Sequence, residues 1–279
     1  MSALALSIVE SGAAYKWSCI WEYEWGSSTV YDVLFARQWE DSDARRLVIA
    51  ALVKCVDWDF EFDLPHGWTI LFDGALREFA PTLGVMTKVH DGQRLAAIVS
   101  GAVEGGRSST IVDEQGIARS ISCVREASDV AHHWRNVLKI EGGSRLDLEF
   151  AAKRAFPNLV FSEGFFGQFG RLQGDRRENR LKVFAHLEVL SDYGTLIWAQ
   201  WTQAHERIAA MGSRGVTCSP ESSGTRSQSG KMDQRRVFFG DREVLCEWHT
   251  KLEPNRNRIH FSIENGAVFV GRMVGHLPT

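Results

Sequence analysis

The stretch "RIHFSIENGAVFVGRM", Arg258–Met273, decides how the C-terminal part of this chain folds. Two runs of alternating apolar and polar residues flank the dipeptide Asn265-Gly266. Asn-Gly between alternating runs is the strongest short signal for a β-hairpin, because both central residues of a type I′ turn need a positive φ. The stretch therefore predicts two antiparallel strands joined by a two-residue turn.

Counting outward from this turn predicts which residues face each other across the hairpin. The pairs expected on the inward, mostly apolar face are Ile263–Val268, Phe261–Val270 and Ile259–Arg272, and those on the outward face are Ser262–Phe269, His260–Gly271 and Arg258–Met273. We thus expect Arg258 and His260 to point outward. The glycine opposite His260 should leave open space above the imidazole ring.

Further strand signals precede the hairpin. "RRVFF" and "REVLCEWH" are separated by Gly240-Asp241, so the four runs together predict a four-stranded antiparallel sheet. In the strand before the hairpin, Glu247, His249 and Lys251 share one face by the period of two. If that face is also the outward one, an acid, two histidines, a lysine and an arginine meet on one surface.

The segment Ser213–Gln234 is rich in Ser and Gly and has no apolar period. It predicts a long loop or linker and the best domain boundary. Before it, 128–212 reads as helices broken by Gly142-Gly143, Pro157 and Gly194. The fold class expected is α+β, with a mixed region at 1–127, a helical region at 128–212, and a loop plus antiparallel sheet at 213–279.

Within the mixed region, two kinds of pattern stand out. "WSCIWEYEW", residues 17–25, alternates strictly and predicts a strand with an aromatic wall on one side. "DSDARRLVIAALVKCV", residues 41–56, predicts a capped helix. The segments 94–106 and 116–124 predict two further strands joined by a loop that contains Gly and Ser.

Charge is distributed unevenly along the chain, whose formal net charge is −3. The segment 213–279 carries ten Lys and Arg against seven Asp and Glu, and a second basic segment, "RLQGDRRENRLK" at 171–182, carries five against two. An acidic body with a locally basic end suits a protein that meets a polyanion at one place. It would equally suit a docking face for an acidic protein partner.

Composition also limits the cellular setting and the cofactors. No apolar run approaches the 18 or so residues that span a bilayer, and the first residues make a poor secretory signal. We therefore expect a cytoplasmic protein without membrane contact. The five cysteines are widely spaced and lack a CxxC pair, which predicts buried reduced thiols; no metal and no cofactor are expected.

The basic sheet has a clear chemical use in cleaving RNA through its own 2′-hydroxyl. That reaction needs a base, an acid and cations around the phosphate, and His, Lys and Arg supply these without a metal. The candidate catalytic residues are His249, His260 and His276. The candidate phosphate-binding residues are Lys251, Arg256, Arg258 and Arg272. Taken singly, the histidines could equally be satisfied sheet residues, and Arg256 and Arg258 could pair with Glu253 and Glu264.

The end of the chain, 258–279, resembles the last hairpin of RelE- and HigB-type mRNA interferase toxins. Arg258, Arg272, Gly275 and His276 match their pattern of a basic strand, a turn, a β-branched strand and a basic tail. The whole tail, with "SPES" at 219–222 before it, also resembles the end of a group of uncharacterised bacterial proteins associated with phage defence. Two departures are the length, since these toxins are about a third as long, and the Ser/Gly loop where the toxins have helices directly before the sheet.

Two hypotheses follow. In the first, segment 213–279 is a metal-independent, toxin-like endoribonuclease with a role in antiviral defence, governed by the N-terminal region. The resemblance implies RNA as the substrate and a protein partner or inhibitor. In the second, the chain is a non-catalytic sensor or assembly subunit whose basic sheet docks RNA or an acidic protein.

Overall fold

The computed structural model describes residues 15–16, 20–22, 24–25, 27–35, 42–57, 69–72, 75–78, 96–98, 108–112, 118–124, 127–141 and 148–275. These residues form two compact units, 1–136 and 137–279. The class is α+β, as predicted. Among the described helices, none combines the length and apolarity needed to cross a membrane.

The N-terminal unit contains a five-stranded sheet of order β6-β5-β8-β9-β7 and two described helices. The sheet strands are β5 (Thr69–Phe72), β6 (Ala75–Glu78), β7 (Ala96–Ile98), β8 (Ser108–Val112) and β9 (Ala118–Val124). Helices α2 (Val30–Phe35) and α3 (Ser42–Lys54) share a small core around Leu34, Val48 and Ala51. The short strands β1 (Tyr15–Lys16), β2 (Glu24–Trp25), β3 (Ser28–Thr29) and β4 (Val56–Asp57) pair as β1-β4 and β2-β3.

Several expectations for this unit can be compared with the structure. The helix expected at 41–56 is confirmed as α3, and strands within 94–106 and 116–124 are confirmed as β7 and β9. The strand expected over 17–25 is wrong, because Ile20–Glu22 forms a 3₁₀ turn (η1) before the two-residue β2. A strict alternation of aromatic and polar residues therefore does not suffice for a strand here.

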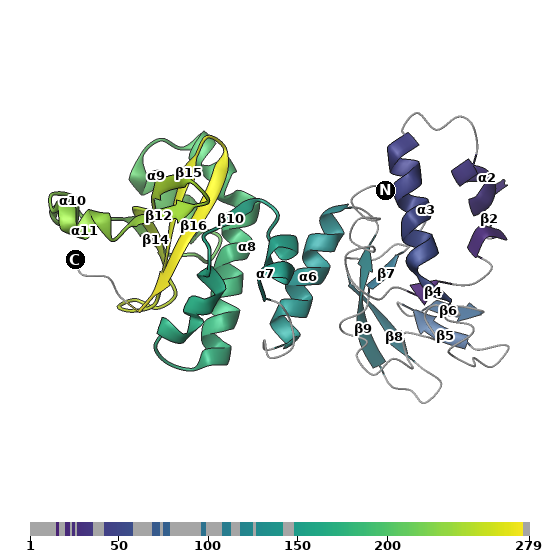
Figure 1. Ribbon diagram of the computed structural model, residues 1–279. Coiled ribbons are helices and arrows are strands. Elements are labelled where there is room, and N and C mark those ends of the chain that lie inside the picture. Colours follow the sequence, from purple (N-terminus) through teal and green to yellow (C-terminus); the bar gives the residue numbers. More distant parts are fainter. Residues whose placement is uncertain are drawn as a thin grey trace. The chain divides into compact units, whose positions relative to one another are not determined.

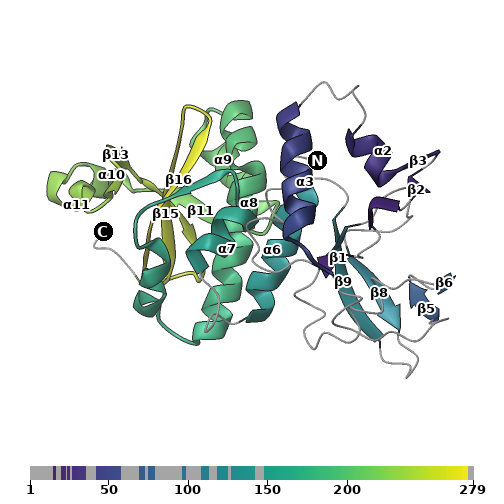
Figure 2. The ribbon, with the colours of Figure 1, turned by 45° about the vertical axis from the view of Figure 1, so that its right-hand side comes forward.

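The C-terminal unit is built on a five-stranded sheet of order β10-β16-β15-β14-β11. Its strands are β10 (Leu159–Phe161), β11 (Cys218–Pro220), β14 (Trp248–Lys251), β15 (Arg258–Glu264) and β16 (Ala267–Val274), and its other elements are α7 (Leu148–Ala155), η3 (Phe165–Arg171), α8 (Arg176–Gln200), α9 (Ala204–Gly212), α10 (Ser223–Arg226), α11 (Ser229–Asp233), β12 (Arg236–Phe239) and β13 (Arg242–Leu245). Helix α6 (Ala127–Glu141) crosses the division between the units. Helix α8 covers one face of the sheet, and α10 and α11 lie on its other side (Figures 1 and 2).

Helix α8 runs through Gly194, where the sequence predicted a break. A Cβ at this position would lie 3.1 Å from Ile263 Cδ1 and 3.2 Å from Val268 Cγ2, so the glycine serves close helix–sheet packing. The chain leaves the helix at Trp201 instead, and α9 begins after a capping box formed by Gln203 and Glu206. Helix α9 leads directly into β11.

The predicted four-stranded antiparallel sheet is wrong in its membership. Strands β12 and β13 pair only with each other, and the run "REVLCEWH" is divided into β13 and β14. The main sheet instead takes β11 from the segment expected to be a linker, and it takes β10, which pairs in parallel with β16. The segment Ser213–Gln234 is thus part of this unit and contributes β11, α10 and α11.

The hairpin itself is confirmed. Asn265 and Gly266 have φ values of 51° and 74°, as a type I′ turn requires. The pairs Ile263–Val268, Ser262–Phe269 and Phe261–Val270 form as predicted.

A β-bulge then shifts the register between His260 and Phe261. Beyond it the expected partners are wrong by one residue: His260 pairs with Arg272, Ile259 with Met273 and Arg258 with Val274, while Gly271 is the extra residue. Ser162 binds the backbone at the bulge. Its Oγ donates to the Gly271 carbonyl oxygen at 2.6 Å, and its N–H donates to the Val270 carbonyl oxygen at 3.1 Å. Because of the bulge, Arg272 comes to lie on the same face as His260.

Candidate functional site

The two faces of the C-terminal sheet differ in chemistry. Toward α8 lie Trp248 and Phe261, both against Trp198, and Thr250, whose hydroxyl is 2.9 Å from His186 Nδ1. Alternation along the strands puts the polar residues on the opposite face. We call this opposite face the cluster face, and its residues are His249, Lys251, Arg258, His260 and Arg272.

The two histidines predicted from the sequence lie side by side on the cluster face. His249 and His260 are directly opposite each other on β14 and β15, and their ring centroids are 5.3 Å apart. Both are buried, with exposed fractions of 4% and 1%. The open space expected above His260 is therefore absent, because Arg272 rather than Gly271 is its partner and the buried ion pair of Glu221 and Arg235, at the two ends of segment 221–235, lies beside the ring.

Glu221 and Arg235 complete the cluster, and neither was predicted. The Arg235 Nε lies 3.1 Å from Glu221 Oε1, with exposed side-chain fractions of 1% and 3%. The same oxygen lies 3.5 Å from His249 Nδ1 and 3.8 Å from His260 Nδ1. Burial would raise the pKa of Glu221, but His249 and Arg235 hold it at about 2, so this carboxylate is ionised at neutral pH. Glu221 belongs to "SPES", which entered only through a resemblance, and Arg235 begins the strand signal "RRVFF", which gives it no role in a site.

The imidazoles are electrically neutral and incompletely satisfied. Burial lowers the pKa of His260 to about 3 and also lowers that of His249, although Glu221 opposes both shifts. Within the described part of the chain, no well-formed hydrogen bond reaches either ring nitrogen of His260 or the Nδ1 of His249. The Nδ1 of His249 lies 3.5 Å from Glu221 Oε1, and the Cys246 backbone interacts with the His260 ring. His249 Nε2 lies 3.1 Å from Ser219 Oγ. Glu221, His249 and His260 each offer one metal-ligand atom, all within 4.8 Å of one another.

Lys251 and Arg258 form the next row of the cluster face. They are directly opposite each other on β14 and β15, and both are partly buried. Neither makes an ion pair with any residue that the structure describes, and Arg258 Nε is buried without a partner. Burial lowers the pKa of the Arg258 guanidinium; Glu221 opposes this shift, and Arg235 adds to it. Two like charges in this position repel each other unless an anion joins them.

The remaining candidate residues from the sequence lie in different environments. Arg272 is on the cluster face and donates from Nη1 to the Gln234 carbonyl at 2.8 Å. Arg256 is exposed and paired with Glu253, as its surface alternative predicted. The alternative for Arg258 is wrong, because Glu264 pairs with Arg242 at 2.7 Å. His276 lies outside the described residues.

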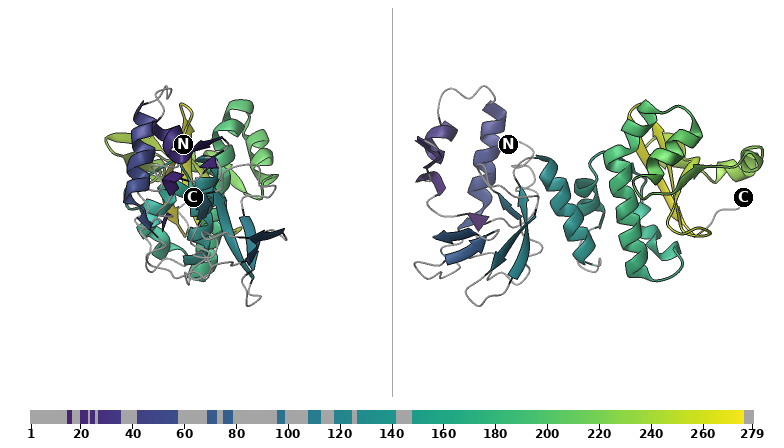
Figure 3. Two further views of the ribbon diagram at one scale, coloured as in Figure 1. Left: turned by 90° about the vertical axis from the view of Figure 1, so that its right-hand side faces the viewer. Right: turned by 180° about the vertical axis from the view of Figure 1, so that it is seen from behind.

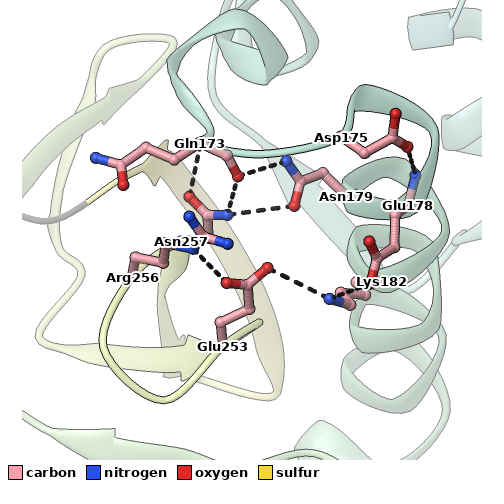
Figure 4. Close-up of polar contacts among 8 residues, drawn as sticks. All are labelled: Gln173, Asp175, Glu178, Asn179, Lys182, Glu253, Arg256 and Asn257. Atoms are coloured by element: carbon pink, nitrogen blue, oxygen red, sulfur yellow. Dashed lines mark hydrogen bonds and ion pairs between the residues drawn. The ribbon is translucent and has the colours of Figure 1, made fainter.

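The two basic segments of the sequence meet at the end of the sheet beyond β14 (Figure 4). Asn257, at φ 57°, accepts from the Gln173 N–H at 2.9 Å and donates to the Gln173 carbonyl at 2.7 Å and to Asn179 Oδ1 at 3.2 Å. Glu253 binds Arg256 and also Lys182, at 3.3 Å. The positive charges shown in Figure 4 are thus largely neutralised, unlike those of Lys251 and Arg258.

Comparison of the chain with protein-family models, with curated proteins and with solved structures gave no match.

Proposed function

We propose that the C-terminal unit binds RNA through the phosphate backbone, with Lys251 and Arg258 as the central phosphate contact. The observation that carries this proposal is their direct opposition on neighbouring strands without a carboxylate partner among the described residues. A phosphate between them would replace repulsion by two charge-assisted contacts. Arg272, one row along the same face, is placed to extend the contact to a neighbouring phosphate.

Two further observations favour RNA over an acidic protein. The tail carries the residues that resemble mRNA interferase toxins, Arg258 and Arg272 among them. In addition, α8 and α9 come directly before β11, and β14, β15 and β16 follow, so helices precede the four antiparallel strands although the parallel strand β10 comes before the helices. The Ser- and Gly-rich segment is an insertion between β11 and β14, not a replacement for the helices.

The test is binding of the full chain to a labelled single-stranded RNA in EDTA, measured by fluorescence anisotropy over a range of salt concentrations. Each phosphate contact to single-stranded nucleic acid contributes about 0.7 to the slope of log K against log salt. Lys251→Ala with Arg258→Ala removes the one phosphate held between them and should therefore weaken binding and reduce this slope by about 0.7. Arg256→Ala is the matched control, because its charge is already paired with Glu253.

The outcomes separate the alternatives. Absence of RNA binding, or binding with an unchanged salt slope in the double variant, would overturn the proposal. If polyglutamate displaces the RNA at equal charge concentration, the cluster face is a docking site for an acidic partner instead. Circular dichroism of the variants controls for loss of structure.

Metal-independent cleavage of RNA is a second candidate function, favoured by the adjacency of His249 and His260 to the Lys251–Arg258 row. An imidazole must reach the reacting atoms to act as acid or base, and both rings are buried. Cleavage therefore requires the segment from Glu221 to Arg235 to move away. Denaturing gels of the same EDTA mixtures test it: cleavage that His249→Gln and His260→Gln both abolish would support a ribonuclease, and intact RNA would leave binding alone.

A further inference from the structure

We infer that Glu221, His249 and His260 form a binding site for a divalent transition metal of the Zn²⁺ type. The inference goes beyond RNA binding and departs from the expectation that the chain binds no metal. It uses residues from three separate strands or strand ends: Glu221 follows β11, His249 is on β14 and His260 is on β15. The fold thus brings together a set that no spacing in the sequence indicates.

The distances between the ligand atoms suit a tetrahedral ion. Zn²⁺ lies about 2.0–2.2 Å from nitrogen and oxygen ligands, and the edge of a tetrahedron of that radius is about 3.3–3.6 Å. The separations of Glu221 Oε1 from His249 Nδ1 and from His260 Nδ1 are 3.5 and 3.8 Å. All three ligand atoms lie within 4.8 Å of one another, so the two rings would have to rotate toward a bound ion to shorten the longer separations to this edge length. Two histidines and one glutamate are also a known protein ligand set for zinc.

The second observation is the unpartnered nitrogens. Almost all buried polar atoms in proteins have a hydrogen-bond partner, and an exception calls for a water, an ion or a functional reason. His260 is 1% exposed, and neither of its ring nitrogens makes a well-formed hydrogen bond with the described residues, although the Cys246 backbone interacts with the ring. An ion held by the two Nδ1 atoms and Glu221 would satisfy His249 and one nitrogen of His260. Both imidazoles are neutral at physiological pH, as a metal ligand must be.

The hydrogen-bond partners of His249 and Glu221 are those that metal-ligating side chains usually have. Ligating histidines donate their other N–H to an oxygen, and ligating carboxylates are hydrogen-bonded in turn. Ser219 Oγ, 3.1 Å from His249 Nε2, is the oxygen that would accept the other N–H of His249. Arg235 Nε, 3.1 Å from Glu221 Oε1, is the donor that binds the carboxylate. The Arg235 guanidinium offsets the charge of the Glu221 carboxylate, so the net charge of the site with Zn²⁺ bound would be +2. This equals the net charge of zinc held by three neutral histidines.

The experiment uses the full chain, stripped of metal with EDTA and dialysed. Titration with Zn²⁺ in a calorimeter should show one site per chain, and Mg²⁺, which prefers oxygen ligands, should show none. Co²⁺ should give the intense visible absorption of tetrahedral coordination. Glu221→Gln and His260→Gln, which are close in size to the native residues, should lower the Zn²⁺ affinity at least a hundredfold. Ser219→Ala should lower it about 10- to 100-fold.

A matched histidine controls for surface binding. His205 on α9 is exposed, and His205→Gln should leave the Zn²⁺ affinity unchanged. No Zn²⁺ binding by the wild type, or binding that survives in folded Glu221→Gln and His260→Gln, would overturn the inference. The readout needs no RNA, so its failure and a failure of RNA binding are separate results. If the chain does cleave RNA with these histidines, Zn²⁺ should inhibit the cleavage and EDTA should restore it.

Discussion

The bulge at Gly271 predicts a specific steric conflict when a single methyl group is added. A Cβ at this position would lie 2.7 Å from Cys246 Sγ and 3.0 Å from Val237 Cγ2. Non-bonded heavy atoms prefer separations of about 3.5–4.0 Å, so the sulfur or the strand would have to move by about 1 Å. Both neighbours belong to a small core with Val244 and Phe269 that has little room to yield. Gly271→Ala should therefore destabilise the C-terminal unit by about 1–3 kcal/mol.

A double-mutant cycle separates this steric conflict from other effects. Cys246→Ala removes the nearer atom, so Gly271→Ala should cost at least 0.5–1 kcal/mol less in that background than in the wild type. Urea unfolding followed by Trp fluorescence gives the four free energies. Gly230→Ala is the control, because a Cβ there meets nothing within 4 Å. If Gly271→Ala costs no more than this control, or if Cys246→Ala brings no relief, the packing described for the bulge is wrong.

Two other perturbations test the same unit. Asn257→Ala and Asn257→Gly both remove the side-chain hydrogen bonds of Asn257, but only alanine keeps a Cβ at φ 57°. In thermal unfolding the alanine variant should therefore be less stable than the glycine variant by about 1–2 kcal/mol. Equal stability of the two variants would contradict a left-handed residue at this position. Burial, aided by Lys182, lowers the pKa of His186 to about 4, while the unfolded value is 6.5. The unfolded chain thus binds the proton first, and the free energy of unfolding should fall by up to about 3 kcal/mol as the pH drops from 7 to 4. His186→Gln should flatten this decline in urea titrations at several pH values, and an unaltered pH profile would show that His186 is not buried neutral.

Local rules predicted much of the C-terminal hairpin and little of its surroundings. Asn265-Gly266 determines three cross-strand pairs because the turn geometry acts over a few residues. The bulge depends on Ser162 and Cys246, which are distant in sequence, so counting from the turn fails beyond Phe261. Gly194 was interpreted as a helix break for the same reason: the contacts that require a glycine there come from β15 and β16.

The candidate site was predicted in part. Alternation put His249 and Lys251 on one face of their strand and Arg258 and His260 on one face of theirs, and left open whether these faces coincide. The pairing of β14 with β15 puts all four on one face, in two rows. Burial was not predicted, since the covering segment has the composition of a linker. Glu221 occurs among Ser and polar residues, and Arg235 begins the strand signal "RRVFF" beside a second arginine; neither context distinguishes a buried ion pair from two surface charges.

Strand β16 is the last strand of its sheet in chain order, yet it lies between β10 and β15. On a ribosome, β10 emerges more than a hundred residues before the strand beside which it must lie, so synthesis through Val274 is needed before the sheet can close. Until then β10 and β15 each present an unpaired edge, and such edges invite pairing with other chains. A nascent or prematurely ended chain therefore has α8 and three antiparallel strands but no completed cluster face, and it is a natural client for chaperones. Figure 3 shows the complete chain, in which β16 has joined the sheet, in two further views.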